Sequence, residues 1–340
     1  MKIDFILPWV NGNDPKWLNE RNLYIKKENK KENSDFRFRD FGTLKYVLRS
    51  IEYCCPWYNK IYLITEGHYP EWLNLSNPKI ELISHKEFYF NTEDLPVFSS
   101  SSIEMNLANI RSLSDNFVYL NDDTIIINPL EKDRFFKDNL PVDFLCHGWI
   151  PRNKLFFLLK GNDSWVKSIS NNIKLAKELV TSLPNNNDSL YNKSYSLKNK
   201  IANFLAKNIY HNYFWFEHWH HPQAYKKDTL SFVYKTFEKQ LLNCSKNKFR
   251  TNNDLTHYVY RYTHLLKNEF FPCKHNDGLI KNISSLDDLE TIASEINGGK
   301  YNFLCLNDSP KIGDSDFPII KNAMNALLDN ILPNKSSFEI

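Results

Sequence analysis

The sequence predicts an α/β protein with a mostly parallel, doubly wound sheet and an inserted helical subdomain. In the first half of the chain, short apolar segments alternate with segments in which apolar residues recur at helical spacing. Polar residues directly follow several of the apolar segments, as in open sheets that bind ligands at the carboxyl ends of their strands. From about residue 153 to 210 helical periodicity continues alone, which indicates an insertion.

The N-terminal part defines the predicted sheet. Apolar runs bounded by turn-forming residues predict strands at 2–10, 60–65, 79–84 and 117–120. Helical periodicity predicts helices at 17–31, 44–51 and 100–113. The second of these helices is stopped by Pro56, and the first ends in a charged run at 26–32 that is typical of a solvated face.

The rest of the chain is mainly helical. Periodic segments predict helices at 166–183, 197–209, 237–243, 255–266, 286–296 and 317–331. A short apolar strand is expected at 301–306. We therefore expect an α/β core at 1–152, a helical insertion or lid at 153–210, and a part at 211–340 that completes the core.

Composition limits the partners of the protein. The chain has 340 residues, of which 42% are hydrophobic and 24% charged, and its net charge is +3. These values predict an ample core and no nucleic-acid partner, because the strongly basic surface of a nucleic-acid-binding protein is missing. The six cysteines show no metal-binding spacing and are expected to be reduced, as in a cytoplasmic protein. No apolar segment is long enough to span a membrane, so we expect at most peripheral association with its inner face.

The most informative stretch is Asn121-Asp122-Asp123, which closes the strand predicted at 117–120. Adjacent carboxylates at the carboxyl end of a strand suit a hard divalent cation, Mg²⁺ or Mn²⁺, that also contacts a diphosphate. A simple polar turn would have the same sequence. Asn307-Asp308 follows the later strand at 301–306 and repeats this arrangement.

Two candidate sites lie near the N-terminus. Asn11 and Asp14 occupy the loop after the first strand, which often contacts a nucleotide, although Asn-Gly and Asp-Pro also form ordinary turns. Arg39 precedes the second helix, where a guanidinium and a helix N-terminus together favour a phosphate. Asp40 is equally suited to an ordinary N-cap.

Two further candidates lie in the C-terminal part. His220 and His221 belong to a histidine cluster that ends at Pro222. An imidazole is the usual general base for a hydroxyl nucleophile and also binds metals, but the flanks lack the spacing of a zinc site, and packing against aromatic residues is the alternative. Arg250 precedes a predicted helix and is suited to clamp a phosphate, while Asp254 would cap that helix or orient the arginine.

Taken in order, these motifs resemble those of the Stealth family. This family comprises bacterial capsular and cell-wall polysaccharide phosphotransferases and the animal GlcNAc-1-phosphotransferase that marks lysosomal enzymes. The resemblance covers nearly the whole chain outside the insertion. It falls in four blocks, at 3–15, at 37–123, around His220, Pro222, Arg250 and Asp254, and at 303–308.

The resemblance implies transfer of a hexose-1-phosphate on a GT-A or Rossmann-like core at 1–152 that binds a nucleotide sugar. The hydroxyl of a glycan acceptor, free or lipid-linked, would attack the sugar-linked phosphorus of UDP-N-acetylhexosamine or UDP-hexose, form a phosphodiester and release UMP. Mg²⁺ or Mn²⁺ would be held by Asp122 or Asp123, together with Asn307 and Asp308.

The resemblance also implies roles for the other candidates. Arg250 and Arg39 would bind the phosphoryl oxygens. His220 is the favoured match to the family histidine that acts as base, with His221 as the alternative, and a different division of roles makes Asp123 the base. The remaining donor contacts would come from Asn11, Asp14, Asp40, Asn121 and Asp254.

Two other functions fit the same residues. A metal-dependent GT-A glycosyltransferase would bind the diphosphate in the same way but would attack the anomeric carbon and release UDP. A non-catalytic carbohydrate-binding module would use the 8 Trp and 18 Tyr of the chain as stacking platforms and would need no metal.

Overall fold

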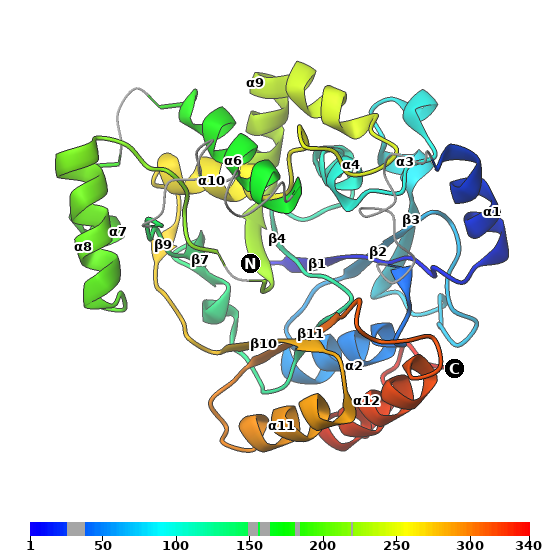
Figure 1. Cartoon of the computed structure of the whole chain (residues 1–340). Helices are drawn as coiled ribbons and strands as arrows, with labels where there is room; N and C mark the ends of the chain where they lie inside the picture. Colours follow the sequence, from blue (N-terminus) through cyan, green and yellow to red (C-terminus); the bar gives the residue numbers. More distant parts are fainter. Residues whose placement is uncertain (26–37, 149–155, 157–163, 181–183, 219) are drawn as a thin grey trace.

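The computed structural model describes residues 1–25, 38–148, 156, 164–180, 184–218 and 220–340 (Figure 1). The charged run predicted at 26–32, the boundary at residue 152 and the end of the helix predicted at 166–183 lie outside the described residues.

The central sheet is mostly parallel, as predicted. In the described part of the chain its strands are β1 (Ile3–Pro8), β2 (Ile61–Thr65), β3 (Ile80–Ser84), β4 (Asn116–Tyr119) and β8 (Gln223–Lys226), in the order β3-β2-β1-β4-β8. The first four run parallel, and β8 pairs antiparallel with β4 at the edge. Since β2 lies on one side of β1 and β4 on the other, the winding direction reverses between β1 and β4, where such sheets bind their ligands.

Helices cover both faces of this sheet, which confirms the doubly wound α/β prediction (Figure 1). Alternate residues of β1 point to opposite faces: Phe5 joins one core cluster and Ile6 the other. The Phe5 side is covered by α2 (Leu44–Cys54), α11 (Leu286–Ile296) and α12 (Phe317–Ile331). The Ile6 side is covered by α4 (Ser100–Glu104), α9 (Lys227–Ser245) and α10 (Tyr258–Leu266).

Two small sheets were not predicted. One has the order β10-β11-β5 and contains β5 (Thr124–Ile126), β10 (Gly278–Ile283) and β11 (Phe303–Asp308). The other joins β6 (Phe136–Lys137), β7 (Leu140–Asp143) and β9 (Phe271–Pro272). The strand expected at 301–306 is β11, and it lies in the first of these small sheets, outside the central one.

The described part of the insertion is helical, as expected. It contains α6 (Ser164–Lys177), α7 (Asn187–Tyr191), α8 (Leu197–Leu205) and a π-helical turn at Ala206–Tyr210. Ile169 and Ile173 of α6 share a hydrophobic core with Tyr262 of α10. The insertion therefore packs against α10, and its action as a lid stays a prediction.

The helix predicted at 100–113 is shorter than expected. It ends at Glu104 and is followed by a 3₁₀ turn at Leu107–Asn109. Asn106 explains the break, because its side chain donates to Ser102 O and accepts from Phe90 N, contacts that compete with helical backbone bonds. Two further helices, α1 (Pro15–Tyr24) and α3 (His85–Phe88), follow strands β1 and β3 along the chain. No helix among the described residues has the length and hydropathy needed to cross a membrane.

Candidate functional site

A cavity of about 430 Å³ opens at the carboxyl ends of β1, β2 and β4. Its wall includes Trp9 after β1, Glu66 after β2 and Asp123 after β4. The cavity therefore lies where the winding of the sheet reverses, the position expected for a ligand in an open α/β fold.

The small sheet β10-β11-β5 completes the cavity wall. β5 directly follows the Asn121–Asp123 corner and pairs antiparallel with β11, placing Thr124 opposite Cys305. The backbone N–H of Leu306 donates to Asp123 O at 3.1 Å. This pairing brings Asn307 to the same cavity as Asp123, so the two strand ends identified in the sequence do meet, although they belong to different sheets.

Oxygen ligands for a hard cation gather in this cavity. Asp122, Asp123, Asn307 and Asp40 all line it. Burial, together with the nearby carboxylates of Asp123 and Asp40, raises the pKa of Asp122 to about 8. Carboxylates crowded to this degree repel one another, and a bound divalent cation would relieve that repulsion, so the residues present fit Mg²⁺ or Mn²⁺.

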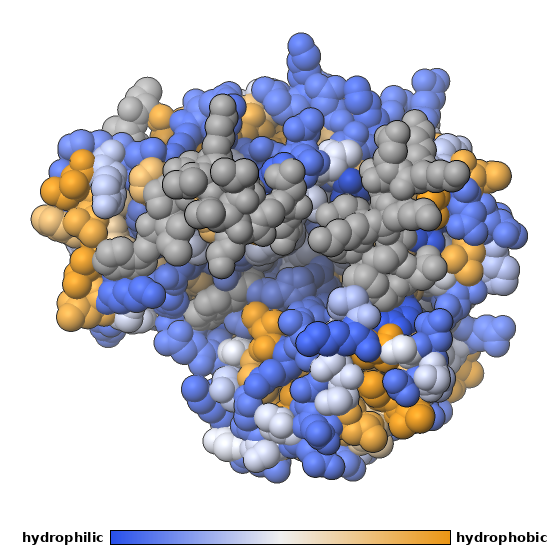
Figure 2. All heavy atoms as spheres, viewed as in Figure 1, coloured by the Kyte–Doolittle hydropathy of each residue, from blue (hydrophilic) through white to orange (hydrophobic). Residues whose placement is uncertain are grey.

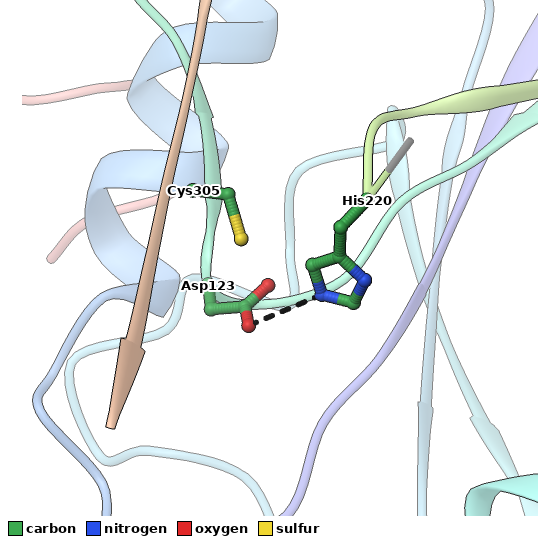
Figure 3. Close-up of side chains that lie close together, drawn as sticks. All are labelled: Asp123, His220 and Cys305. Carbon is green, nitrogen blue, oxygen red and sulfur yellow. Dashed lines mark ion pairs between the residues drawn. The ribbon is translucent and has the colours of Figure 1, made fainter. Parts of the chain in front are cut away.

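His220 lies beside Asp123 (Figure 3). Its Nε2 is 3.5 Å from Asp123 Oδ2, and the His220 side chain is 39% exposed. Burial opposes the charged form of both groups, but the hydrogen bond and attraction between them outweigh it. The pKa of Asp123 is therefore lowered and the pKa of His220 raised from their ordinary values.

Two further side chains, those of Asn121 and Cys305, lie close to the His220 ring. Asn121 Nδ2 lies 3.2 Å from the same Nε2 and donates to it when this nitrogen carries no proton. Cys305 comes from β11 on the other side of Asp123, and ligand atoms of Cys305, Asp123 and His220 lie within 4.8 Å of one another (Figure 3). Burial raises the pKa of the Cys305 thiol well above its ordinary value, which favours oxygen ligands over this thiol for a cation.

Arg250 lines the same cavity as Asp123 and His220. Its Nη2 donates to Ser100 Oγ at 3.1 Å. Arg250, His220 and Asn121 also line a second, smaller cavity of about 90 Å³ on the insertion side, which Trp165 of α6 helps to form. Arg250 and His220 therefore lie between the two cavities.

Asp254 shapes the turn that carries Arg250. Its carboxylate accepts from Thr251 N at 2.8 Å and from Asn247 Nδ2 at 2.8 Å. Asp254 lines the smaller cavity, away from the carboxylate cluster. Of the two roles expected from the sequence, it does not cap α10, which begins at Tyr258 after the N-cap His257, and its role in orienting Arg250 stays a prediction.

Arg39 and Asp308 are partners of each other. Arg39 Nε and Nη2 each donate to a carboxylate oxygen of Asp308 at 2.8 Å, and Nη1 donates to Ile312 O at 3.0 Å. The sequence assigned Arg39 to a phosphate and Asp308 to a metal. Because this pairing engages both oxygens of Asp308 and the whole guanidinium fork, the two residues close one side of the cavity as an ion pair instead.

The predicted residues after β1 serve the local backbone. Asp14 is the N-cap of α1 and accepts from Trp17 N at 2.8 Å. The backbone N–H of Asn11 donates to His68 Nε2 at 2.9 Å. Neither Asp14 nor Asn11 belongs to the cavity wall as far as the described residues form it, so the turn interpretation accounts for their positions.

Asp40 does line the cavity, but it is not the helix cap. Its Oδ1 accepts from Gly42 N at 2.7 Å, and the N-cap of α2 is Thr43.

His221 points away from His220. Its ring packs against Phe303 with centroids 5.7 Å apart, and it fills the space beside Gly278, where an added Cβ would lie 1.7 Å from the ring. Burial and the nearby Arg134 lower the pKa of His221 to about 4. Within the described residues, neither cavity wall includes His221, so the geometry favours His220 as the base.

Sequence reasoning missed Glu66 and His85, which both line the main cavity. His85 Nδ1 lies 2.8 Å from Glu66 Oε2. Glu66 directly follows β2 and His85 directly follows β3, so the same strand-end rule that identified Asp123 would have found both.

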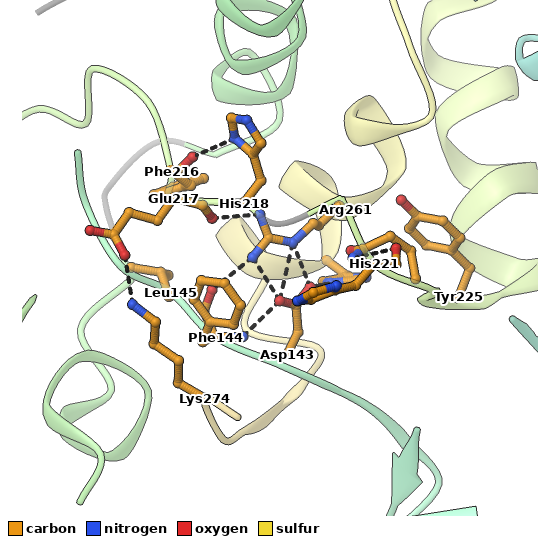
Figure 4. A network of polar contacts seen from close by, with 12 residues as sticks. Asp143, Phe144, Leu145, Phe216, Glu217, His218, His221, Tyr225, Arg261 and Lys274 are labelled. Carbon is orange, nitrogen blue, oxygen red and sulfur yellow. Dashed lines mark hydrogen bonds and ion pairs between the residues drawn. The ribbon is translucent and has the colours of Figure 1, made fainter. Parts of the chain in front are cut away.

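A buried polar network supports the segment that leads to His220 (Figure 4). Asp143, at the end of β7, accepts from Arg261 Nη2 at 2.7 Å and from Nε at 2.9 Å. His264 Nε2 lies 2.8 Å from the same carboxylate. Arg261 Nη1 in turn donates to Glu217 O at 2.8 Å, which ties the backbone just before His220 to α10.

The sequence matches known proteins over the segments that carry Asp123, His220 and Arg250. Residues 1–28, 37–143 and 219–266 match Stealth protein conserved regions 1, 2 and 3. The chain is 34% identical to the capsular polysaccharide phosphotransferase WcwK of Streptococcus pneumoniae, over 99% of this chain and 98% of that protein. It is 32% identical to the exopolysaccharide phosphotransferase cps2G of Lactiplantibacillus plantarum, over 99% and 96% of the two chains.

Solved structures give a more distant likeness. The bifunctional glycosyltransferase WbbM aligns over 98% of this chain and 50% of its own, with 8% identity and a TM-score of 0.43. The sequence matches, in contrast, extend over the full length of both partners and include the blocks that carry Asp123, His220 and Arg250. The chain therefore belongs to the Stealth family.

Proposed function

We propose that this protein transfers a sugar-1-phosphate from a UDP-sugar to a hydroxyl of a capsular or exopolysaccharide glycan and releases UMP. The class of reaction rests on family membership and on full-length relatives named as polysaccharide phosphotransferases. The observation that carries the proposal is the convergence of Asp123, His220 and Arg250 on one cavity. Phosphoryl transfer needs charge neutralisation, positioning and a base, and these side chains supply each of them.

The main cavity suits a nucleotide diphosphate sugar. Its volume of about 430 Å³ falls in the range of small-molecule sites. Trp17 and Phe98 give one part of the wall an aromatic surface suited to a uracil ring. Mg²⁺ or Mn²⁺ held by Asp122, Asp123 and Asn307 would neutralise the negative charge of the diphosphate.

Arg250 is suited to the phosphoryl group that is transferred. It borders both cavities, so a phosphorus atom beside it is open to the donor on one side and to the acceptor on the other. Its planar fork offers two parallel donors to two phosphoryl oxygens, and Ser100 holds it in place through Nη2.

His220 is suited to accept the proton of the attacking hydroxyl at Nε2. While it carries no proton, this atom accepts from Asn121, and after protonation it faces Asp123, whose negative charge stabilises the imidazolium. The smaller cavity gives an acceptor sugar access to the same ring, and its wall offers the hydroxyls of Ser164 and Thr256 and the indole of Trp165.

The test identifies the released nucleotide. Purified protein is incubated with Mg²⁺, candidate UDP-sugars and a capsule or wall polysaccharide. The nucleotide is then separated by chromatography, and the product is examined by phosphorus NMR. UMP together with a phosphodiester resonance in the polysaccharide is the expected result. Release of UDP with a phosphorus-free product would instead identify a glycosyltransferase. Sugar binding with no consumption of donor would identify a carbohydrate-binding module.

A further inference from the structure

The α8 helix buries its polar face and exposes its apolar face. Its buried face consists of small and polar residues, among them Asn199, Ala202 and Asn203. Asn203 is fully buried, and its side chain donates to Leu145 O and Leu190 O and accepts from His147 N. A surface helix ordinarily buries its apolar side chains and exposes its polar ones, so this helix is fixed to the protein by hydrogen bonds and leaves its apolar side outward.

Large apolar side chains cover the outer face of α8 and the π-helical turn that follows it. Leu197 is 74% exposed, Ile201 43%, Phe204 51%, Ile209 59% and Tyr210 53%. Figure 2 shows orange side chains at the left edge of the molecule, where α8 lies in Figure 1. We name these five residues the α8 face. Scattered single apolar residues are normal on a surface, but a continuous row along one segment marks an interaction site.

Lysines predominate along the α8 face. Residues 188–217 contain four lysines and two acidic residues, Asp188 and Glu217, of which Glu217 is paired with Lys274. Lys198 is exposed, and Lys200 and Lys207 are partly exposed, so cationic side chains accompany the apolar row along its length. This combination of outward Leu, Ile, Phe and Tyr with lysines at their sides is typical of helices that lie in the interface of a membrane with anionic lipids.

We propose that the α8 face binds the surface of a membrane that contains anionic phospholipid. The apolar side chains enter the boundary between head groups and acyl chains, and the lysines contact the lipid phosphates. A protein partner or a second copy of this chain would bury the same apolar row, but neither requires an excess of lysines along it. The proposal is independent of the sugar and nucleotide chemistry of the active site.

The test measures binding of the full chain to lipid vesicles by sedimentation. Vesicles of phosphatidylcholine with phosphatidylglycerol are compared with vesicles of phosphatidylcholine alone. We expect binding to the anionic vesicles that weakens as salt is added, because screening reduces the lysine contribution. Failure to sediment with anionic vesicles beyond the level found with neutral ones overturns the proposal.

Variants at exposed apolar residues distinguish membrane binding through the α8 face from non-specific adsorption. Ile201→Ser with Phe204→Ser should weaken vesicle binding by about tenfold or more, since each change removes a side chain that the membrane would bury. Ile319→Ser is the matched control, because Ile319 is 57% exposed on α12, in another layer of the protein. The control should bind as the wild type does. Equal binding by the double variant contradicts the proposal, provided that circular dichroism shows it to be folded.

A pair of charge variants tests the lysines. Lys198→Glu with Lys200→Glu should also weaken binding by about tenfold or more, whereas Lys235→Glu with Lys239→Glu on the exposed side of α9 should have little effect. Sedimentation equilibrium tests the remaining alternative, a dimer formed through the α8 face. A dimer that the Ile201 and Phe204 changes abolish, in a protein that does not bind vesicles, would assign the α8 face to a second copy and refute the membrane proposal.

Discussion

Replacing Asp143 by Asn should destabilise the protein more than the loss of any exposed ion pair. The Asp143 side chain is 8% exposed, and Arg261 and His264, its partners, are each 1% exposed. The variant leaves the charge of Arg261 buried without a counter-charge. Removal of one partner from a buried pair costs about 3–5 kcal/mol of unfolding free energy.

The pKa of Asp143 provides an independent measure of the same interaction. Burial opposes its ionised form, but Arg261 and His264 outweigh that effect and lower the pKa to about 2. Because the folded pKa lies below the unfolded one, the stabilisation is complete above about pH 4 and is lost as the pH falls toward 2, with a total of about 2–3 kcal/mol. Asn does not titrate, so the stability gap between wild type and variant should narrow by about 1 kcal/mol between pH 5 and pH 3.

Urea unfolding followed by tryptophan fluorescence and by far-UV circular dichroism measures both effects. Glu81→Gln is the control, since Glu81 pairs with Lys60 on the surface with side chains 37% and 32% exposed. That change should cost less than about 1 kcal/mol. If Asp143→Asn lowers stability no more than Glu81→Gln does, or if its gap to wild type is the same at pH 5 and pH 3, the reasoning about the buried pair is wrong.

Four further predictions concern residues of the cavity and the neighbouring His221. Asp123→Ala should lower donor turnover by about 10²-fold or more, and EDTA should abolish the wild-type rate; full activity in EDTA would contradict the cation assignment. Arg250→Lys should fold normally and lose most transfer activity, because an ammonium cannot bind two phosphoryl oxygens at once; retained activity would remove Arg250 from the phosphate site. His220→Ala should bind UDP-sugar almost normally in calorimetry but turn over about 10²–10⁴-fold more slowly. His221→Ala should instead lower thermal stability, since its ring packs on Phe303, and equal loss of turnover in both histidine variants would argue against His220 as the sole base.

The sequence predicted the position of the residues after β4 because the strand-end rule is local. Asn121, Asp122 and Asp123 follow a strand that is visible as an apolar run, and the rule places them at the cavity without knowledge of any distant contact. The roles of Arg39 and Asp308 could not be predicted in the same way. They pair across 269 residues of sequence, and each is well suited to the different role assigned to it in isolation.

Adjacent histidines illustrate a second limit. His220 and His221 lie in a bend before β8, and of the two only His220 lines the cavity. The sequence contains no signal for which one it is. The choice depends on Gly278, whose missing side chain leaves room for the ring of His221.

The secondary structure was predicted where hydrophobic periodicity is strong. α12 has the predicted bounds, Phe317–Ile331, as does α11, Leu286–Ile296. Strands such as β8, with the sequence Gln-Ala-Tyr-Lys, were missed because four residues with two polar ends carry little pattern. They form through pairing with neighbours such as β4, which is a tertiary effect.

The pairing of β5 with β11 determines the order in which the walls of the cavity form during synthesis of the chain. A ribosome releases the segment that carries Asp123 well before the segment that carries Asn307. Strands β1 to β4 are able to pair as their own residues emerge, but the opposite wall of the cavity arrives only with β11. Nascent chains therefore hold a carboxylate corner with no facing strand, and the cavity is completed only after β11 has emerged, when contacts between distant parts of the chain close.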